Sequence, residues 1–159
     1  VRSIRFPGVI SWKTPPGGGT TDYAVEIYHK AINKKHYDCF LSKNTKLPMM
    51  FMDDAIKATV DIMRADADAV KIRSSYNLGA ISFTPNEIAE SILSHIKEFT
   101  INYKPDFRQK IADSWPQSID DSNARQDWNW EHKFSLEDIT VEMLTQLDKK
   151  YNGTLEKSK

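Results

Sequence analysis

The hydrophobic and polar positions of the chain follow two different periods. Short apolar runs bounded by turn residues predict strands at residues 1–6, 9–10, 38–42, 49–52, 75–79 and 100–103. Apolar residues at helical spacing predict one helix at residues 22–33 and three others, which begin near Asp53, Thr84 and Ser135. Residues 107–130 fit neither period. Because strands alternate with helices, the pattern predicts an α/β fold class with at least partly parallel strand pairing.

Each predicted helix has one apolar face and a recognisable beginning. The faces are Tyr23, Ala24, Ile27, Tyr28 and Ala31; Ala55, Ile56, Thr59, Val60 and Met63; Ile88, Ala89, Ile92, Leu93 and Ile96; and Leu136, Ile139, Met143, Leu144, Leu147 and Tyr151. Capping boxes start the third helix at Thr84 and the fourth at Ser135. Thr20 or Thr21 is expected to cap the first helix. The acidic pair Asp53-Asp54 is expected to cap the second and to complement its dipole.

Composition and charge exclude several classes of protein. The 159 residues are 40% hydrophobic, and 22 Lys and Arg balance 22 Asp and Glu, so the net charge favours no polyanion. The single cysteine, Cys39, excludes an internal disulfide framework and a thiolate-rich zinc site, and it reads as a small buried hydrophobe. No apolar run approaches the roughly 20 residues of a membrane-spanning helix, and the first residues do not predict a signal peptide. We therefore expect a soluble, cytoplasmic protein.

The sequence pattern also makes a prediction for each end of the chain. The strand pattern begins at Val1 with no polar lead-in, which favours continuation from a longer chain. Residues 152–159 are polar and are expected to form a frayed tail.

A glycine-rich run at residues 14–22 is the first candidate for chemistry. It is neither a Walker A loop, because no Gly-Lys-Ser/Thr follows, nor a dinucleotide fingerprint, because Asp22 takes the third glycine position. It is either a plain loop or a site where Thr20, Thr21 and free amides at a helix start receive a carboxylate or phosphate.

The other candidates are weaker. His29 and His36 lack a third ligand with metal-site spacing, so no metal is expected. A polar cluster at Arg108, Lys110, Asp113 and Trp115 offers a tryptophan that either walls a ligand pocket or covers the core. Trp128 and Trp130 are expected to pack in the core. Periodicity and spacing alone therefore predict no reaction.

Five stretches together carry a family resemblance, at residues 5–11, 14–24, 47–55, 73–78 and 106–116. The most specific are Gly-Gly-Gly-Thr-Thr-Asp-Tyr at residues 17–23 and Ile-Ala-Asp-Ser-Trp-Pro at residues 111–116. Pro-Gly, Asp-Asp-Ala and Tyr-Asn-Leu occur more widely in extended dehydrogenases and nucleotide-sugar epimerases. The chain resembles the L-threonine 3-dehydrogenases of the extended short-chain dehydrogenase/reductase type.

The resemblance covers only the C-terminal half of that family's pattern. The Gly-x-x-Gly-x-x-Gly loop for NAD is missing, and none of the six tyrosines is followed by lysine four residues later. Residues 1–159 are therefore expected to hold the last Rossmann strands and the small substrate-binding domain. The catalytic Tyr/Lys pair would lie in an absent N-terminal half, so the chain by itself is expected to be inactive.

The resemblance implies an activity in threonine catabolism, the NAD⁺-dependent oxidation of L-threonine to 2-amino-3-oxobutanoate. It implies that the Pro7 carbonyl and the Val9 amide hold the nicotinamide carboxamide, and that Trp115 meets the substrate methyl group. It implies further substrate contacts at Gly19, Thr20, Thr21 and Asp22, where Asp22 either pairs with the ammonium or is a helix-start charge.

The implied partners are the N-terminal half, L-threonine, and a second copy in a homodimer when intact. Two alternatives stay open: another epimerase-like relative, and a fragment without catalytic activity.

Overall fold

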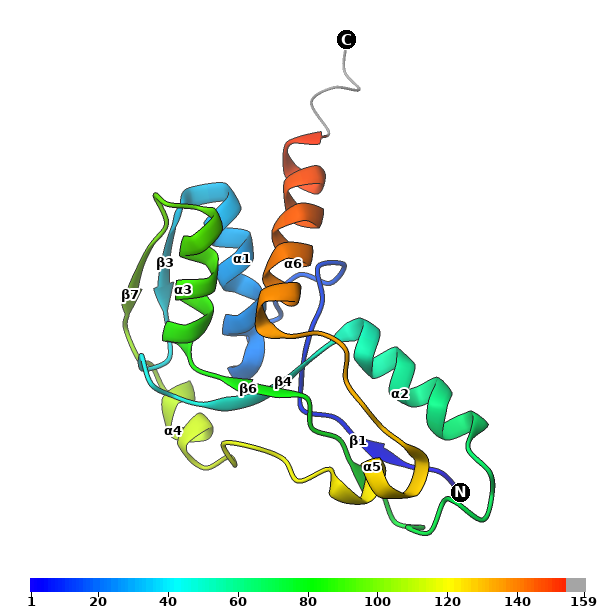
Figure 1. Ribbon diagram of the computed structural model, residues 1–159. Helices are drawn as coiled ribbons and strands as arrows, with labels where there is room; N and C mark the ends of the chain where they lie inside the picture. The colour runs from blue at the N-terminus through cyan, green and yellow to red at the C-terminus, as the bar shows by residue number, and fades with distance from the viewer. Residues whose placement is uncertain (154–159) are drawn as a thin grey trace.

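The computed structural model describes residues 1–153 as a mixed α/β unit (Figure 1). The helices are η1 (Thr20–Asp22, a 3-10 turn), α1 (Tyr23–Lys34), α2 (Met52–Arg64), α3 (Pro85–His95), α4 (Arg108–Asp113), α5 (Ser122–Trp128) and α6 (Leu136–Tyr151). The strands are β1 (Ile4–Arg5), β2 (Gly8–Ile10), β3 (His36–Cys39), β4 (Leu47–Phe51), β5 (Tyr76–Asn77), β6 (Ile81–Phe83) and β7 (Thr100–Tyr103). From residue 154 onward, the predicted frayed tail lies outside the described residues.

Three small sheets confirm the predicted partly parallel pairing. β1 pairs with β5, β2 with β4 and β3 with β7, all parallel, while β6 joins the other edge of β4 antiparallel. The register places Val9 opposite Met50 and Tyr37 opposite Ile101. Parallel pairs need a long crossover, and α1 provides such a crossover between β2 and β4.

Helices α1, α3 and α6 lie side by side and contact one another (Figure 1). Their buried faces confirm most of the predicted stripes: Tyr23, Ala24, Ile27, Tyr28 and Ala31 in α1; Ile88, Ala89 and Ile92 in α3; Ile139, Met143, Leu144 and Leu147 in α6. Tyr151, predicted as the last residue of the α6 stripe, is exposed. Both predicted capping boxes are present, since the hydroxyls of Thr84 and Ser135 each accept an amide hydrogen at 3.2 Å. No helix within residues 1–153 is long and apolar enough to span a membrane.

The structure corrects several predicted boundaries. β3 begins at His36 and ends at Cys39 rather than covering residues 38–42, and residues 81–83 form a strand that the pattern missed. Residues 107–130 contain the short helices α4 and α5, so Arg108, Lys110 and Asp113 are helical. A helix of six or seven residues makes too few turns to show a period of 3.6. Trp128 and Trp130 are buried, which confirms core packing.

Helix α2 has a different buried face from the one predicted. Asp54, Ala55, Ala58 and Ile62 are buried, whereas the side chains at 56 and 63 are 55% and 70% exposed. The exposed side of α2 faces a shallow apolar groove of 280 Å³, which we call the α2 groove. It is lined by Phe6, Val9, Met52, Ala55, Ile56 and Thr59. The apolar stripe therefore exists, but nothing within residues 1–153 covers it.

The capping interpretation of the acidic pair is wrong. Phe51 is the N-cap of α2, and no side chain caps the helix. The carboxylate of Asp54 is 1% exposed and accepts the amide hydrogens of Lys133 and Phe134 at 2.8 and 3.1 Å. Asp53 stays exposed in the first turn, where the helix dipole favours it. Asp54 thus fastens the link between α5 and α6 to the start of α2.

Candidate functional site

A cavity of 310 Å³ lies where β2, η1, β4 and the segment after α4 meet. We call it the Thr21–Trp115 cavity. It is lined by Phe6, Pro7, Gly8, Thr21, Pro48, Trp115, Pro116 and Ile119. Its volume is at the lower end of the roughly 300–1,000 Å³ that small-molecule sites occupy. Most of the lining residues are apolar, and Thr21 is the one that carries a hydroxyl. The cavity therefore suits a small ligand with a mixed surface.

Three of the predicted site residues meet in this cavity: Pro7, Thr21 and Trp115. The Trp115 side chain is 43% exposed, so it walls the cavity rather than closing the core. The other four predicted residues do not line the cavity. Thr20 is buried, with 8% of its surface exposed, and Val9 lines the α2 groove. Gly19 and Asp22 lie in the glycine-rich loop.

Sequence reasoning did not single out Gly8, although the close packing of this position shapes the cavity. A Cβ added at Gly8 would lie 2.6 Å from the Met49 sulfur and 2.8 Å from the Thr21 methyl carbon. β2 therefore approaches both β4 and η1 so closely that only glycine fits without a shift. In the sequence, the Pro7-Gly8 dipeptide, which interrupts the strand pattern, was the available sign of this close packing.

Gly8→Ala is expected to destabilise the protein by about 1–3 kcal/mol, because the added methyl group forces Met49 and Thr21 apart. Thermal unfolding measures this effect. Gly153→Ala is the matched control, since a Cβ at Gly153 meets nothing within 4 Å. Equal melting temperatures for the two variants would contradict the close approach.

The glycine-rich loop is organised by its own aspartate. One carboxylate oxygen of Asp22 accepts the amide hydrogens of Gly17 and Gly19 at 2.7 and 2.9 Å. Between them, Gly18 has φ +96°, in the left-handed region that favours glycine. Thr20 and Thr21 lie in η1 and cap no helix, since α1 begins after Asp22 without a side-chain cap. That expectation was wrong, while pairing of Asp22 with a substrate ammonium stays a prediction.

Pro7 lies directly before β2 and lines the Thr21–Trp115 cavity, and its contact with a nicotinamide carboxamide stays a prediction. Val9 lies two residues on in β2, opposite Met50.

Two further side chains that could carry chemistry, those of Cys39 and His29, are buried. Cys39 is fully buried, and burial raises the pKa of its thiol to about 11, so it is a poor nucleophile. Its expected role as a small buried hydrophobe is confirmed. His29 is buried in α1, where Nδ1 lies 2.7 Å from the Tyr151 hydroxyl. Residues 1–153 contain no group of three or more His, Cys, Asp or Glu side chains placed to hold a metal ion.

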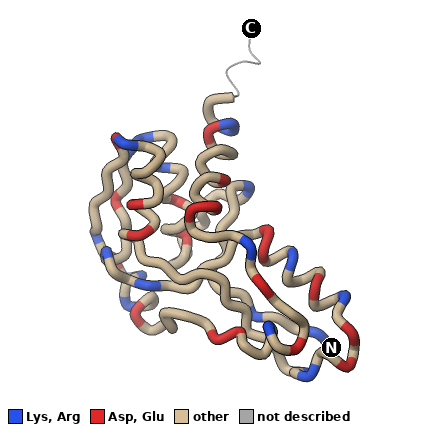
Figure 2. The backbone as a smooth tube through the Cα atoms, viewed as in Figure 1, with Lys and Arg blue, Asp and Glu red and all other residues tan. Residues whose placement is uncertain are grey.

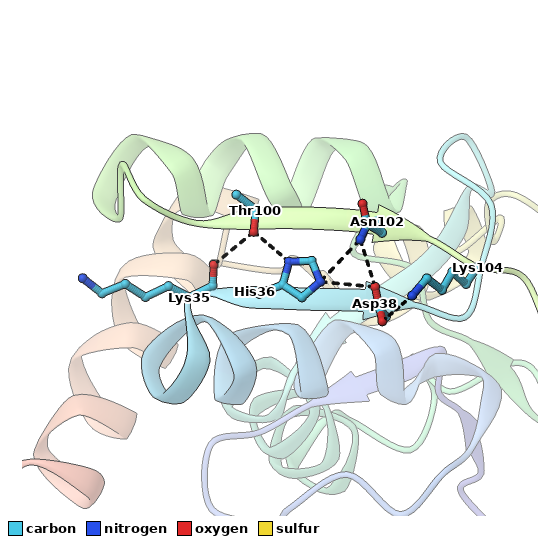
Figure 3. Close-up of polar contacts among 6 residues, drawn as sticks. All are labelled: Lys35, His36, Asp38, Thr100, Asn102 and Lys104. Atoms are coloured by element: carbon cyan, nitrogen blue, oxygen red, sulfur yellow. Dashed lines mark hydrogen bonds and ion pairs between the residues drawn. The ribbon is translucent and has the colours of Figure 1, made fainter.

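A polar network covers the outer face of the β3–β7 sheet (Figure 3). It links Lys35, His36, Asp38, Thr100, Asn102 and Lys104. Lys104 and Asn102 donate hydrogen bonds to Asp38 at 2.7 and 3.2 Å, and these bonds, with a smaller one from His36, lower the pKa of Asp38 to about 2. Because its members bind one another across the strands, the network fastens this sheet. Elsewhere, charges of both signs are interspersed along the backbone (Figure 2).

Comparisons with known proteins agree on one kind of relative. No protein-family model matches the chain. It is 49% identical to the mitochondrial L-threonine 3-dehydrogenase of Bos taurus over 144 residues, which cover 90% of this chain and 38% of that protein. It is 48% identical to an uncharacterised epimerase/dehydratase of Staphylococcus aureus, covering 94% of this chain and 47% of the relative.

Among solved structures, the crystal structure of L-threonine dehydrogenase from Phytophthora infestans matches with a TM-score of 0.91 and 54% identity. The match covers 94% of this chain and 48% of that one. The chain therefore spans half or less of the length of these relatives, and nearly all of it follows their sequence and fold.

Proposed function

We propose that this chain, a homologue of the NAD-dependent L-threonine 3-dehydrogenases, is the substrate-facing half of such an enzyme. The proposed reaction oxidises the side-chain hydroxyl of L-threonine and gives 2-amino-3-oxobutanoate. The observation that supports it most directly is the Thr21–Trp115 cavity, where three residues implied by the family resemblance meet.

The proposed work of this half is to position the reactants. Bound NAD⁺ supplies a hydride acceptor, and a Tyr/Lys pair in the other half would take the hydroxyl proton. The Pro7 carbonyl would accept a hydrogen bond from the carboxamide nitrogen, and the Val9 amide would donate one to its oxygen. Holding both reactants in line removes much of the entropic cost of the reaction.

The substrate would lie against η1 and Trp115. The Thr21 hydroxyl would donate to the carboxylate of threonine, and the indole of Trp115 would cover its methyl group. Gly19 and Thr20 would present backbone groups beside Thr21, and Asp22 would face the ammonium.

A nucleotide-sugar epimerase activity is less well supported by the cavity. A pyrophosphate is usually bound by arginine or lysine. No cationic side chain from residues 1–153 lines the Thr21–Trp115 cavity. The cavity therefore favours a small substrate with little net charge.

The rest of the enzyme is proposed to cover the α2 groove. Phe6 is 42% exposed and Ile56 is 55% exposed beside it, and uncovered apolar surface of this kind marks an interface. An N-terminal half carrying the NAD loop and the Tyr/Lys pair is the proposed partner, and two intact enzymes would form a homodimer. A cytoplasmic location stays a prediction, and the bovine relative is named as mitochondrial.

Thr21→Val and Trp115→Ala are each expected to lower kcat/KM for L-threonine at least tenfold in the intact enzyme, or about 1.4 kcal/mol of transition-state stabilisation. Valine keeps the shape of threonine but cannot donate a hydrogen bond, and alanine removes the apolar wall. NADH absorbance measures the rate.

Two substitutions serve as matched controls. Thr145→Val changes an exposed threonine on α6, and Val141→Ala shortens an apolar side chain that is 45% exposed on the same helix. Both are expected to leave kcat/KM within twofold of wild type. Unchanged kinetics in both Thr21→Val and Trp115→Ala would refute the site, and turnover of a nucleotide sugar in place of threonine would refute the substrate.

A further inference from the structure

The side chain of Arg108 crosses from the start of α4 to the glycine-rich loop. Its Nη1 donates a hydrogen bond to the Gly18 carbonyl at 3.2 Å. Its guanidinium carbon lies 3.2 Å from the centre of the Phe40 ring, so the planar group stacks on the end of the β3 segment. Only 18% of the side chain is exposed. Arg108 is therefore packed in place rather than extended into solvent.

Asp106 holds the other side of the guanidinium. Its carboxylate lies 2.6 Å from Nη2, and both of its oxygens lie 3.1 Å from Nε. The guanidinium thus contacts a carboxylate, an aromatic ring and a carbonyl at once. A planar donor with several N–H groups can do this, whereas a lysine ammonium cannot donate in the same directions while stacking on a ring.

The side chains of Asp22 and Arg108 together hold the backbone around Gly18. Asp22 accepts the amide hydrogens of Gly17 and Gly19 on either side of it, and Arg108 binds its carbonyl. Its left-handed backbone, with φ +96°, turns the chain sharply at this point. Hydrogen bonds within the loop therefore fix its conformation, and the Arg108 side chain connects it to α4.

The two elements that Arg108 connects each lead to a residue that lines the Thr21–Trp115 cavity. The loop runs directly into η1, which contains Thr21. α4 runs into Trp115, whose amide donates to the Ala112 carbonyl at 3.1 Å. The contact between Arg108 and Gly18 thus connects the loop that precedes Thr21 to the helix that precedes Trp115.

We infer that Arg108 is a positioning residue that fixes the width of the Thr21–Trp115 cavity and thereby the affinity for the amino-acid substrate. This inference rests on the proposed function for the identity of the substrate. The link itself, between the loop and α4, is independent of any substrate. Arg108 acts through Thr21 and Trp115 and does not line the cavity.

The test compares Arg108→Met and Arg108→Lys with Lys110→Ala, which removes an exposed positive charge from the same helix. Amide hydrogen exchange, measured on the intact enzyme, is expected to be at least tenfold faster at Gly17 and Gly19 in both Arg108 variants and unchanged in Lys110→Ala. In the intact enzyme, KM for L-threonine is expected to rise about tenfold in both Arg108 variants. KM for NAD⁺ and kcat are expected to stay within twofold.

The two readouts separate the possible failures. Unchanged exchange at Gly17 and Gly19 in Arg108→Met would overturn the link between loop and helix. Faster exchange with an unchanged KM for L-threonine would overturn the positioning role. Full rescue by Arg108→Lys, or the same effect in Lys110→Ala, would show that charge alone matters and would also overturn it. A wild-type enzyme that does not oxidise threonine would refute the proposed function, while the exchange result would still test the link.

Discussion

Asp54→Ala is expected to destabilise the protein by about 3 kcal/mol, because it removes a buried carboxylate that accepts two hydrogen bonds. The amides of Lys133 and Phe134 would lose their partner. The Phe134 ring, whose centre lies 4.7 Å from that of Phe51, would lose the backbone contact that holds it there. Urea unfolding followed by tryptophan fluorescence measures the loss.

The neighbouring carboxylate provides the control. Asp53 is exposed in the same turn of α2, so Asp53→Ala should cost only the dipole interaction, about 0.3–1 kcal/mol. Asp54→Asn keeps the shape and one acceptor oxygen, and is expected to fall between the two. Equal losses for Asp53→Ala and Asp54→Ala would mean that the bonds from Asp54 to the link between α5 and α6 contribute nothing.

The sequence predicted those features that depend on neighbours within one turn. The faces of α1, α3 and α6 follow from a period of 3.6, and the capping boxes at Thr84 and Ser135 follow from residues three apart. Asp54 looked like a cap because a local rule places acids at helix starts. Its real partners are far along the chain at Lys133 and Phe134, and no local pattern reveals them.

The predicted stripe on α2 is present but largely exposed, for a different reason. Ile56 and Met63 do form an apolar side of the helix, as the periodicity indicates. Periodicity identifies a surface that has to be covered, but it does not say whether the cover belongs to the same chain. In this structure the stripe faces outward beside Phe6.

The candidate site came from the family resemblance rather than from spacing. Pro7, Thr21 and Trp115 are far apart in sequence, and the fold brings them together at one cavity. Gly8 allows β2 to approach β4 and η1 closely, and the long side chain of Arg108 connects α4 to the glycine-rich loop. Both roles depend on tertiary contacts, so the Pro-Gly dipeptide and the polar cluster near residue 108 were only indirect signals.

The largest expected effect concerns the chain by itself. Purified alone, at a mass of 18.3 kDa, it is expected to form no NADH from L-threonine and to be poorly soluble. The sequence holds neither the glycine loop for NAD nor a Tyr-x-x-x-Lys pair, and the α2 groove is uncovered. Co-expression with the N-terminal half of a threonine dehydrogenase is expected to give a complex with threonine-dependent activity.

Substitutions in the α2 groove test whether the second half binds there. Ile56→Glu places a charge among apolar side chains and is expected to abolish both co-purification and activity. Val141→Glu is the matched control, because Val141 is 45% exposed on α6, away from the groove, and should leave both unchanged. Threonine-dependent NADH from the chain alone, as a monodisperse monomer with a cooperative melt, would refute the two-half arrangement. Co-purification that survives Ile56→Glu would place the partner on another face.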